Sequence, residues 1–302
     1  MNSSTVHTAD VSLQPDNNGV QARYTIHYLI ADPTGNITIL VLDPVPVCDQ
    51  SAVAAVLMKK ESAAEQVGFL TLPEPARTDS ADPIIFPHPG FKKYDLKLRM
   101  AGGEFCGNAS MSAAAFRAWQ IGLQHAQFTL HVSGTDVPVV VKIDAAEKPM
   151  SWFGQVQMPD PRKIEVVSFP EDIQLPVVAF DGITHIIIQD GQDFIKNGLN
   201  PSVRSRAEDH ARKWCRFLQA EALGILFLNA SADRLIPLVY VPGADTLFWE
   251  TSCGSGSAAA GAWLASHENR KITVSLKQPG GTLEVIASPG GPLFLKGTVT
   301  FI

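Results

Sequence analysis

CGNASMSAAAF, residues 106–116, recurs in altered form as CGSGSAAAGAW, residues 253–263. Each copy begins with Cys-Gly, places a serine four residues after the cysteine, and continues through small residues to an aromatic side chain. One copy lies in each half of the 302-residue chain. The repeat therefore predicts two equivalent halves, each of which presents one thiol at the start of a helix.

The segments that follow the two cysteines have the composition of buried helices. Residues 108–121 contain one charged side chain, Arg117, and residues 255–266 contain none. A helix that is apolar on all sides must be buried on all sides. We therefore expect each half to be a curled sheet wrapped around one Ala-rich helix.

Strand and turn patterns dominate the remaining sequence, in which apolar runs alternate with turns such as Asp32-Pro33-Thr34-Gly35. Strands are expected at 24–30, 36–42, 69–72, 94–100, 177–180, 183–188, 225–228, 235–241, 272–276, 282–286 and 294–302. Further helices are expected at 51–60 and 210–223. The predicted fold class is α+β, with two pseudo-symmetric lobes, each a curled, mostly antiparallel sheet around its central helix.

The expected domain organisation follows the repeat. Residues 1–20 are expected to form a flexible tail, residues 21–147 the N-terminal lobe and residues 148–291 the C-terminal lobe. A C-terminal strand near 292–302 is expected to complete the N-terminal lobe. A Pro-rich loop passes through Pro87-His88-Pro89-Gly90.

Composition and charge limit the classes of partner. The chain is 45% hydrophobic and 18% charged, as folded globular proteins are, and its net charge is −6. Nucleic acids and anionic membranes attract basic patches, so neither is an expected partner. The sequence shows no signal peptide and no apolar run long enough for a transmembrane helix, so a cytoplasmic location is expected. The net charge does not disfavour a small zwitterionic or cationic ligand, and a homodimer is compatible with the sequence.

The cysteines are expected to be free thiols, as in a reducing compartment. They are Cys48, Cys106, Cys215 and Cys253. None belongs to a metal-spaced pair, and no nucleotide-binding or pyridoxal motif is visible, so no metal and no cofactor is expected. Cys215, between Trp214 and Arg216, is expected to be a core residue.

The two remaining thiols suggest a chemistry that needs a pair. A helix start offers free N–H groups and a partial positive charge, which favour a thiolate and bind a carboxylate. Inversion of an α-carbon requires a base on one face and an acid on the other, and tunable thiols suit both roles. The backbone N–H groups expected to hold the substrate carboxylate are those of Gly107, Asn108, Gly254 and Ser255.

These motifs resemble the diaminopimelate epimerase family of pyridoxal-independent amino-acid racemases. Residues 103–108 are similar to its first Cys-Gly-Asn motif, and residues 250–256 to its second Cys-Gly-Ser-Gly motif. Residues 34–36 and 182–185 resemble its early Gly-Asn and its Gly-Asn-Pro-His. The resemblance implies a fold of two lobes with a central helix in each, and a catalytic pair formed by Cys106 and Cys253.

The resemblance also implies supporting roles for particular side chains. His185 would orient or deprotonate Cys106, while Asn36 would contact the substrate. Glu250, three residues before Cys253, would polarise that thiol or bind an ammonium group, or would instead cap the following helix. Glu104 has a similar position in the first motif and is a further candidate for substrate binding.

Departures from the family pattern concern the substrate. Ile183 replaces a substrate-binding Asn, and residues 240–243 replace the Glu-Arg pair that grips the distal end of diaminopimelate. The residues of both Cys motifs are more similar to those of the branch that includes histidine racemases of opine-metallophore pathways. Proline racemases have His where this chain has Asn108, and the phenazine-biosynthesis isomerases lack the cysteine pair.

The predicted function is therefore a cofactor-independent amino-acid racemase or epimerase that uses two cysteines as its bases, with histidine as the expected substrate. Three alternatives stay open. The first is an epimerase of diaminopimelate or another amino acid, and the second is a non-catalytic amino-acid-binding protein on the same scaffold. The third is a redox sensor in which the two thiols form a disulfide.

Overall fold

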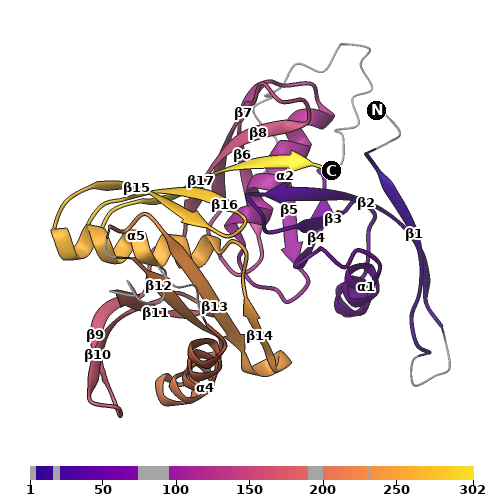
Figure 1. Ribbon diagram of the computed structural model, residues 1–302. Coiled ribbons are helices and arrows are strands. Elements are labelled where there is room, and N and C mark those ends of the chain that lie inside the picture. Colours follow the sequence, from indigo (N-terminus) through magenta and orange to yellow (C-terminus); the bar gives the residue numbers. More distant parts are fainter. Residues whose placement is uncertain (1–4, 16–20, 74–94, 190–199, 230) are drawn as a thin grey trace.

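The computed structural model describes residues 5–15, 21–73, 95–189, 200–229 and 231–302. It is a mixed α/β structure with two sheets (Figure 1). The first sheet has the order β1-β2-β3-β4-β5-β6-β7-β8-β17-β16-β15. Its strands are β1 (His7–Ser12), β2 (Arg23–Pro33), β3 (Thr38–Val41), β4 (Gln66–Thr71), β5 (Leu96–Met100), β6 (His125–Val132), β7 (Val139–Ala145), β8 (Ser151–Met158), β15 (Ile272–Gln278), β16 (Gly281–Ala287) and β17 (Leu293–Phe301).

The first sheet closes on itself because β17 pairs with both β8 and β2. Two of its pairings, β3 with β4 and β5 with β6, are parallel, and the others are antiparallel. Its strands β15 and β16 continue past β17 and lie outside the closed part. The chain thus returns its last strand to the sheet that its first strands begin.

Helix α2 (Gly107–Gln120) lies inside this closed sheet (Figure 1). All of its residues from Gly107 to Phe116 are buried, as is Ala118. It packs against β2, β3, β6, β7, β8 and β17. Gly154 on β8 lets the sheet approach closely, because a Cβ there would lie 2.9 Å from the sulfur of Met111. The expectation of a helix buried on all sides within a wrapped sheet is confirmed.

The second sheet has the order β14-β13-β12-β11-β10-β9. Its strands are β9 (Lys163–Phe169), β10 (Ile173–Ala179), β11 (Thr184–Gln189), β12 (Leu223–Leu228), β13 (Leu235–Val241) and β14 (Thr246–Trp249), and a 3₁₀ turn η1 (Pro242–Ala244) joins the last two. Helix α5 (Gly254–Glu268) packs between this sheet and strands β15, β16 and β17. Leu226 and Leu228 share a buried cluster with α5, whereas Ile225 and Phe227 face the opposite side of the sheet.

Two further helices cover outer faces and depart from the expected bounds. Helix α1 is Val47–Lys60, so it begins four residues before the expected start at residue 51. Helix α4 is Pro201–Leu218, not 210–223. Its start has a signal that periodicity alone does not show: the Asn200 side chain accepts a hydrogen bond from the Val203 amide at 3.0 Å, and Pro201 occupies the first helical turn.

The expectation of a flexible tail at residues 1–20 is wrong for part of that segment. Strand β1 pairs with β2 from His7 to Ser12, and Val11 is buried against the cluster that includes α1. Alternating polar and apolar residues in β1 carry too weak a pattern to distinguish a short edge strand from a tail. Strand β8 lies beyond residue 147 and continues the first sheet. The expected loop at Pro87–Gly90 lies outside the described residues.

Within the described ranges, no helix is long and apolar enough to cross a membrane.

Strands β6, β7, β8, β9 and β14 are present although no strand was expected there. In β7 the apolar Val139, Val141 and Ile143 are buried, and Lys142 and Asp144 between and after them are exposed. This alternation is the ordinary signal of a half-buried strand, so the local sequence of β7 does favour the strand that was not expected.

Candidate active site

The starts of α2 and α5 meet at Leu295 on β17. A Cβ added to Gly107 would lie 3.3 Å from the Leu295 side chain, and one added to Gly254 would lie 3.1 Å from it. The same added Cβ at Gly254 would lie 3.4 Å from Oδ1 of Asn108 on the other helix. Because the two Cys-Gly segments approach each other this closely, both N-terminal helix ends open onto one shared site.

The two cysteines cap their helices in the same way. Cys106 Sγ accepts the Ala109 amide at 3.4 Å, and Cys253 Sγ accepts the Gly256 amide at 3.3 Å. Each cysteine carbonyl also accepts the hydroxyl of the serine four residues later, at 2.7 Å in both helices. The repeat in the sequence is therefore a repeat of hydrogen bonds. It fixes each thiol beside the first-turn amides of its own helix.

The first thiol lies beside the parallel pair β3–β4. That register sets Gln66 next to Thr38, and Gln66 Oε1 accepts the Cys106 thiol at 3.2 Å. Asn36, just before β3, accepts the Asn108 side-chain amide at 3.2 Å. Asn108 Oδ1 is buried and has no hydrogen-bond partner in the described part of the chain.

The second thiol has different neighbours. Cys253 is buried, and the Glu250 carboxylate interacts with its thiol. The Ser255 hydroxyl lies 3.5 Å from Cys253 Sγ and 3.1 Å from Nε2 of His185. Gln278 on β15 accepts the Cys253 amide at 2.8 Å and donates to Ser257 at 2.8 Å, which holds this helix start in place.

The structure changes the role expected for His185. Its Nε2 atom lies 3.1 Å from the Ser255 hydroxyl beside the second thiol, and in the described part of the chain its Nδ1 atom has no hydrogen-bond partner, so the imidazole forms no hydrogen bond with Cys106. The ring is fully buried on β11, opposite Gly224, where any Cβ would overlap Nδ1. Burial lowers the pKa of His185 to about 3, so the imidazole is neutral at physiological pH and cannot hold the proton of a thiol.

The expectation that the helix ends lower both thiol pKa values is also corrected. Burial raises the pKa of Cys106 to about 11, although the Ala109 amide acts in the opposite direction. Burial and the adjacent Glu250 carboxylate raise the pKa of Cys253 well above its usual value. Desolvation of a thiolate exceeds the effect of one backbone amide here. Both thiols are therefore protonated in the site as it stands.

Burial also raises the pKa of Glu250 to about 7, with a further contribution from the nearby Glu65 carboxylate. Glu250 does not cap α5, because Cys253 holds the capping position. The exposed Glu104 adds to the raised pKa of Cys106 through its charge. The site therefore contains acidic side chains near both thiols.

A second set of contacts joins the loop before α5 to the turn after β2. Glu65 accepts Asn36 Nδ2 at 2.6 Å and the Thr251 hydroxyl at 2.7 Å. Thr251 also lies 2.7 Å from the Gly35 carbonyl, and Gly35 packs against Gly280 in the β15–β16 turn. Sequence reasoning missed Glu65, Gln66, Thr251 and Gln278. Thr251 lies within the second Cys motif but was given no role; the other three belong to no motif, and only the strand register brings them to the thiols.

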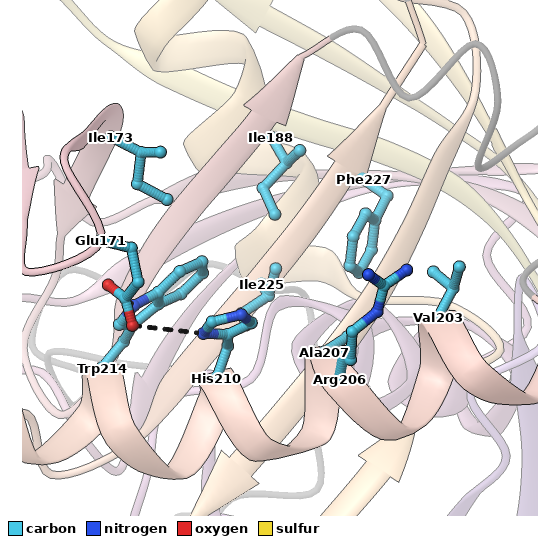
Figure 2. Close-up of a pocket in the computed structure, with 10 residues that line it drawn as sticks. All are labelled: Glu171, Ile173, Ile188, Val203, Arg206, Ala207, His210, Trp214, Ile225 and Phe227. Carbon is cyan, nitrogen blue, oxygen red and sulfur yellow. Dashed lines mark hydrogen bonds and ion pairs between the residues drawn. The ribbon is translucent and has the colours of Figure 1, made fainter.

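A cavity of about 350 Å³ lies elsewhere, between α4 and the outer face of the second sheet. Figure 2 shows Trp214 and His210 rising from α4 toward Ile225, with Glu171 paired to His210. Because Ile225 and Phe227 line it, this cavity opens on the face of the sheet that points away from α5 and the thiols.

Within the described residues, no group of three or more His, Cys, Asp or Glu side chains could hold a metal ion.

Solved structures with this fold include isomerases. A predicted epimerase from Pseudomonas aeruginosa superposes with a TM-score of 0.61 at 13% identity, covering 91% of this chain and 96% of that one. A PhzF-family phenazine biosynthesis protein from Enterococcus faecalis gives 0.53 at 13% identity, covering 92% and 96%. Methylitaconate-delta-isomerase gives 0.52 at 10% identity, covering 98% and 95%. At these identities the likeness shows the fold alone.

The chain is an isomerase of the amino-acid racemase and epimerase class. Residues 25–292 match the family model described as the histidine racemase CntK N-terminal domain, and the chain belongs to that family. A histidine racemase of Fusobacterium nucleatum is 29% identical over 285 residues, which cover 92% of this chain and 95% of that protein. One of Staphylococcus aureus is 27% identical over 295 residues, covering 93% and 96%.

Proposed function

We propose that this protein interconverts the enantiomers of histidine, without a cofactor, by a two-base mechanism in which Cys106 and Cys253 face opposite sides of the α-carbon. The observation that carries the proposal is the meeting of two identically capped Cys-Gly helix starts at Leu295. We further propose that the arrangement is the diaminopimelate epimerase-like fold, with a central helix in each half.

The substrate carboxylate is proposed to bind between the two helix starts. The first-turn amides of Gly107, Asn108, Gly254 and Ser255 have no acceptor within their own helices. Together with the positive ends of both helix dipoles they favour an anion, and they stabilise the charge that develops on the carboxylate as the α-proton leaves. The unpartnered Asn108 Oδ1 is suited to accept a hydrogen bond from the α-ammonium group.

The proton transfers balance without an outside reagent. Glu250 takes the proton of the Cys253 thiol, and the resulting thiolate removes the α-proton from one face of histidine. Cys106 then delivers its proton to the other face, which inverts the carbon. After product release, solvent returns a proton to Cys106, and Glu250 gives up the proton that it holds. His185 stays neutral throughout and acts as a hydrogen-bonding partner of Ser255.

Histidine is supported as the substrate by the relatives, whose names give that activity. The acidic groups beside the thiols support the same choice. Glu65, Glu104 and Glu250 disfavour a negatively charged side chain and accommodate a neutral or cationic imidazole. A second carboxylate, as in glutamate, would meet like charge in this site.

The test is exchange of the α-proton of free amino acids in deuterated buffer under reducing conditions. L-Histidine should lose its α-proton signal and acquire the D-enantiomer, whereas glutamate, proline, lysine and diaminopimelate should exchange at least about 100-fold more slowly, in line with the discrimination that a few polar contacts give. No exchange of histidine at any enzyme concentration would exclude the proposal. Binding of histidine without exchange would favour the amino-acid-binding alternative.

The raised pKa of Glu250 has a consequence for stability. The carboxyl of the folded protein titrates at about 7, above its ordinary value near 4.5. Between these values the folded state retains a proton that the unfolded chain has lost, so the free energy of unfolding falls as pH rises through this window. We expect a decrease on the order of 2 kcal/mol after allowing for solvent screening.

Urea unfolding of the wild type and of Glu250→Gln, at pH values from 5 to 8, measures this decrease. The neutral isostere should remove most of the pH dependence. Identical slopes in the two proteins would contradict the burial of an ionisable group at this position.

A further inference from the structure

A chain of directed hydrogen bonds ends at the first thiol. It begins at Glu65, because the oxygens of a carboxylate can only accept hydrogen bonds. The atom of Asn36 that lies 2.6 Å from this carboxylate must therefore be the amide nitrogen, Nδ2. The opposite atom of the Asn36 side chain, Oδ1, is then an acceptor.

The orientation of the Asn36 side chain in turn fixes the orientation of the Gln66 side chain. Gln66 Nε2 lies 2.6 Å from Asn36 Oδ1 and donates to it. The same nitrogen lies 2.7 Å from Thr38 Oγ1, whose hydroxyl hydrogen is already donated to the Asn36 carbonyl at 2.9 Å. Two acceptors thus hold the NH₂ group of Gln66. Its remaining atom, Oε1, faces Cys106 Sγ at 3.2 Å and can only accept.

We infer that the chain Glu65–Asn36–Gln66 holds Cys106 as a protonated thiol in the resting enzyme, so that Cys106 is the proton donor for the enantiomer that Cys253 deprotonates, with Gln66 as a positioning residue. The donor role rests on the proposed function, but the direction of the hydrogen bond does not. An amide turned the other way would donate to a thiolate and stabilise it.

The second thiol lacks such a constraint. The Glu250 carboxylate, which interacts with it, can take a proton, which a carboxamide oxygen cannot. The Ser255 hydroxyl can turn to donate to the thiolate. The two helix starts have the same backbone geometry, but the side chains around them favour Cys253 as the base and Cys106 as the acid when the resting enzyme takes up substrate, and the reverse order for the opposite enantiomer.

The groups that face Cys106 oppose or favour its ionisation in distinct ways. Burial and the charge of Glu104 raise the pKa of the thiol, and the Ala109 amide at the helix start lowers it. The Gln66 side chain is credited with lowering this pKa as well, a sign that holds only for an amide that donates its N–H to the sulfur. Because its carbonyl oxygen faces the sulfur instead, removal of Gln66 should make the thiolate easier to form.

The pH dependence of thiol alkylation tests whether removal of Gln66 makes the Cys106 thiolate easier to form. Full-length protein without substrate is treated with iodoacetamide at several pH values, and peptide mass spectrometry follows Cys106 and Cys253 separately. In Gln66→Met, which keeps the length of the side chain, alkylation of Cys106 at a fixed pH near 8 should rise about threefold, the effect of one weak hydrogen bond. Cys253 in the same sample should stay unchanged. A fall, or no change, at Cys106 would overturn the inference.

A second variant tests whether Glu65 sets the orientation of Asn36 and Gln66. Glu65→Gln frees Asn36 to turn, so the chain can reverse and alkylation of Cys106 should rise more than that of Cys253. Thr251→Val is the matched control: it removes the other hydrogen bond of Glu65 but keeps the carboxylate, and should leave Cys106 unchanged. An equal rise at both thiols would mean that the lost charge alone acts, and would also overturn the inference.

These outcomes are independent of the proposed function. Alkylation is measured without substrate, so its sign reports on the hydrogen bond whether or not histidine is the substrate. Conversely, wild-type protein that fails to exchange the α-proton of histidine would refute the proposed function and leave the measured orientation of Gln66 intact.

Discussion

Cys253→Ser should lower the rate of histidine racemisation by at least about 10³-fold, because a positioned base or acid contributes roughly 10²–10⁴-fold and serine cannot ionise near neutral pH. Cys106→Ser should have an effect of similar size. Each variant retains one thiol on one face of the α-carbon. Each should therefore exchange the α-proton of one enantiomer slowly and without inversion, and the two variants should prefer opposite enantiomers.

Cys215→Ser is the matched control for loss of a buried thiol. Cys215 lies on α4, in the cluster on the far side of the second sheet, and its thiol donates to the Ala220 carbonyl at 3.3 Å. Its replacement should leave racemisation within about twofold of wild type, because surroundings distant from the reacting atoms change little. Chiral chromatography and α-deuterium incorporation, measured together, check both results. Racemisation by Cys253→Ser at the wild-type rate would refute the two-thiol mechanism.

Gly35→Ala should be the most disruptive single-methyl change near the site. Gly35 has a φ of +92°, and a Cβ there would overlap the backbone of Gly280. Backbone cannot move aside as a flexible side chain can, so the turn after β2 must shift away from the β15–β16 turn. Strain and overpacking together should lower the free energy of unfolding by about 3 kcal/mol or more. Thr251 Oγ1 lies 2.7 Å from the Gly35 carbonyl, so the displacement should also reach the site.

Gly122→Ala separates the cost of backbone strain from the cost of the contact with Gly280. Gly122 also has a positive φ, +73°, but a Cβ there has nothing within 4 Å. This variant should lose about 1 kcal/mol from backbone strain alone and should keep its activity. Urea unfolding gives the stability of both variants, and kcat/KM for histidine should fall more than tenfold only in Gly35→Ala. Equal losses of stability and activity would show that the contact with Gly280 is not important.

Much of the fold follows from local patterns in the sequence. The two Ala-rich segments lack charged side chains, so burial on all sides was the only stable outcome for them, and the structure shows α2 and α5 enclosed in that way. Segments such as Leu235–Val241, with strong β-branched and apolar character, form strands at the expected residues. Weakly patterned segments such as β1 could not be assigned, because pairing with β2 supplies the hydrogen bonds that make it a strand.

The candidate site shows the same division. The repeat located both thiols and the first-turn amides, because a Cys-Gly that starts a helix is a local feature. The role expected for His185 was placed at the wrong thiol, and its pKa could not be foreseen, since burial on β11 beside Gly224 determines both. Thiol pKa values were expected to fall and instead rise, because desolvation depends on the whole enclosure and the helix end is only one part of it.

The sequence by itself determined that the chain has two thiol-bearing helix starts, that each helix is buried, and that the protein resembles amino-acid racemases. Only the tertiary structure decided which groups surround each thiol. The parallel register of β3 and β4 brings Gln66 to Cys106, and strand β11 brings His185 to Ser255 beside Cys253. The physical reason is that helix capping is encoded within a few consecutive residues, whereas the proton affinity of a buried thiol depends on side chains from strands far apart in the chain.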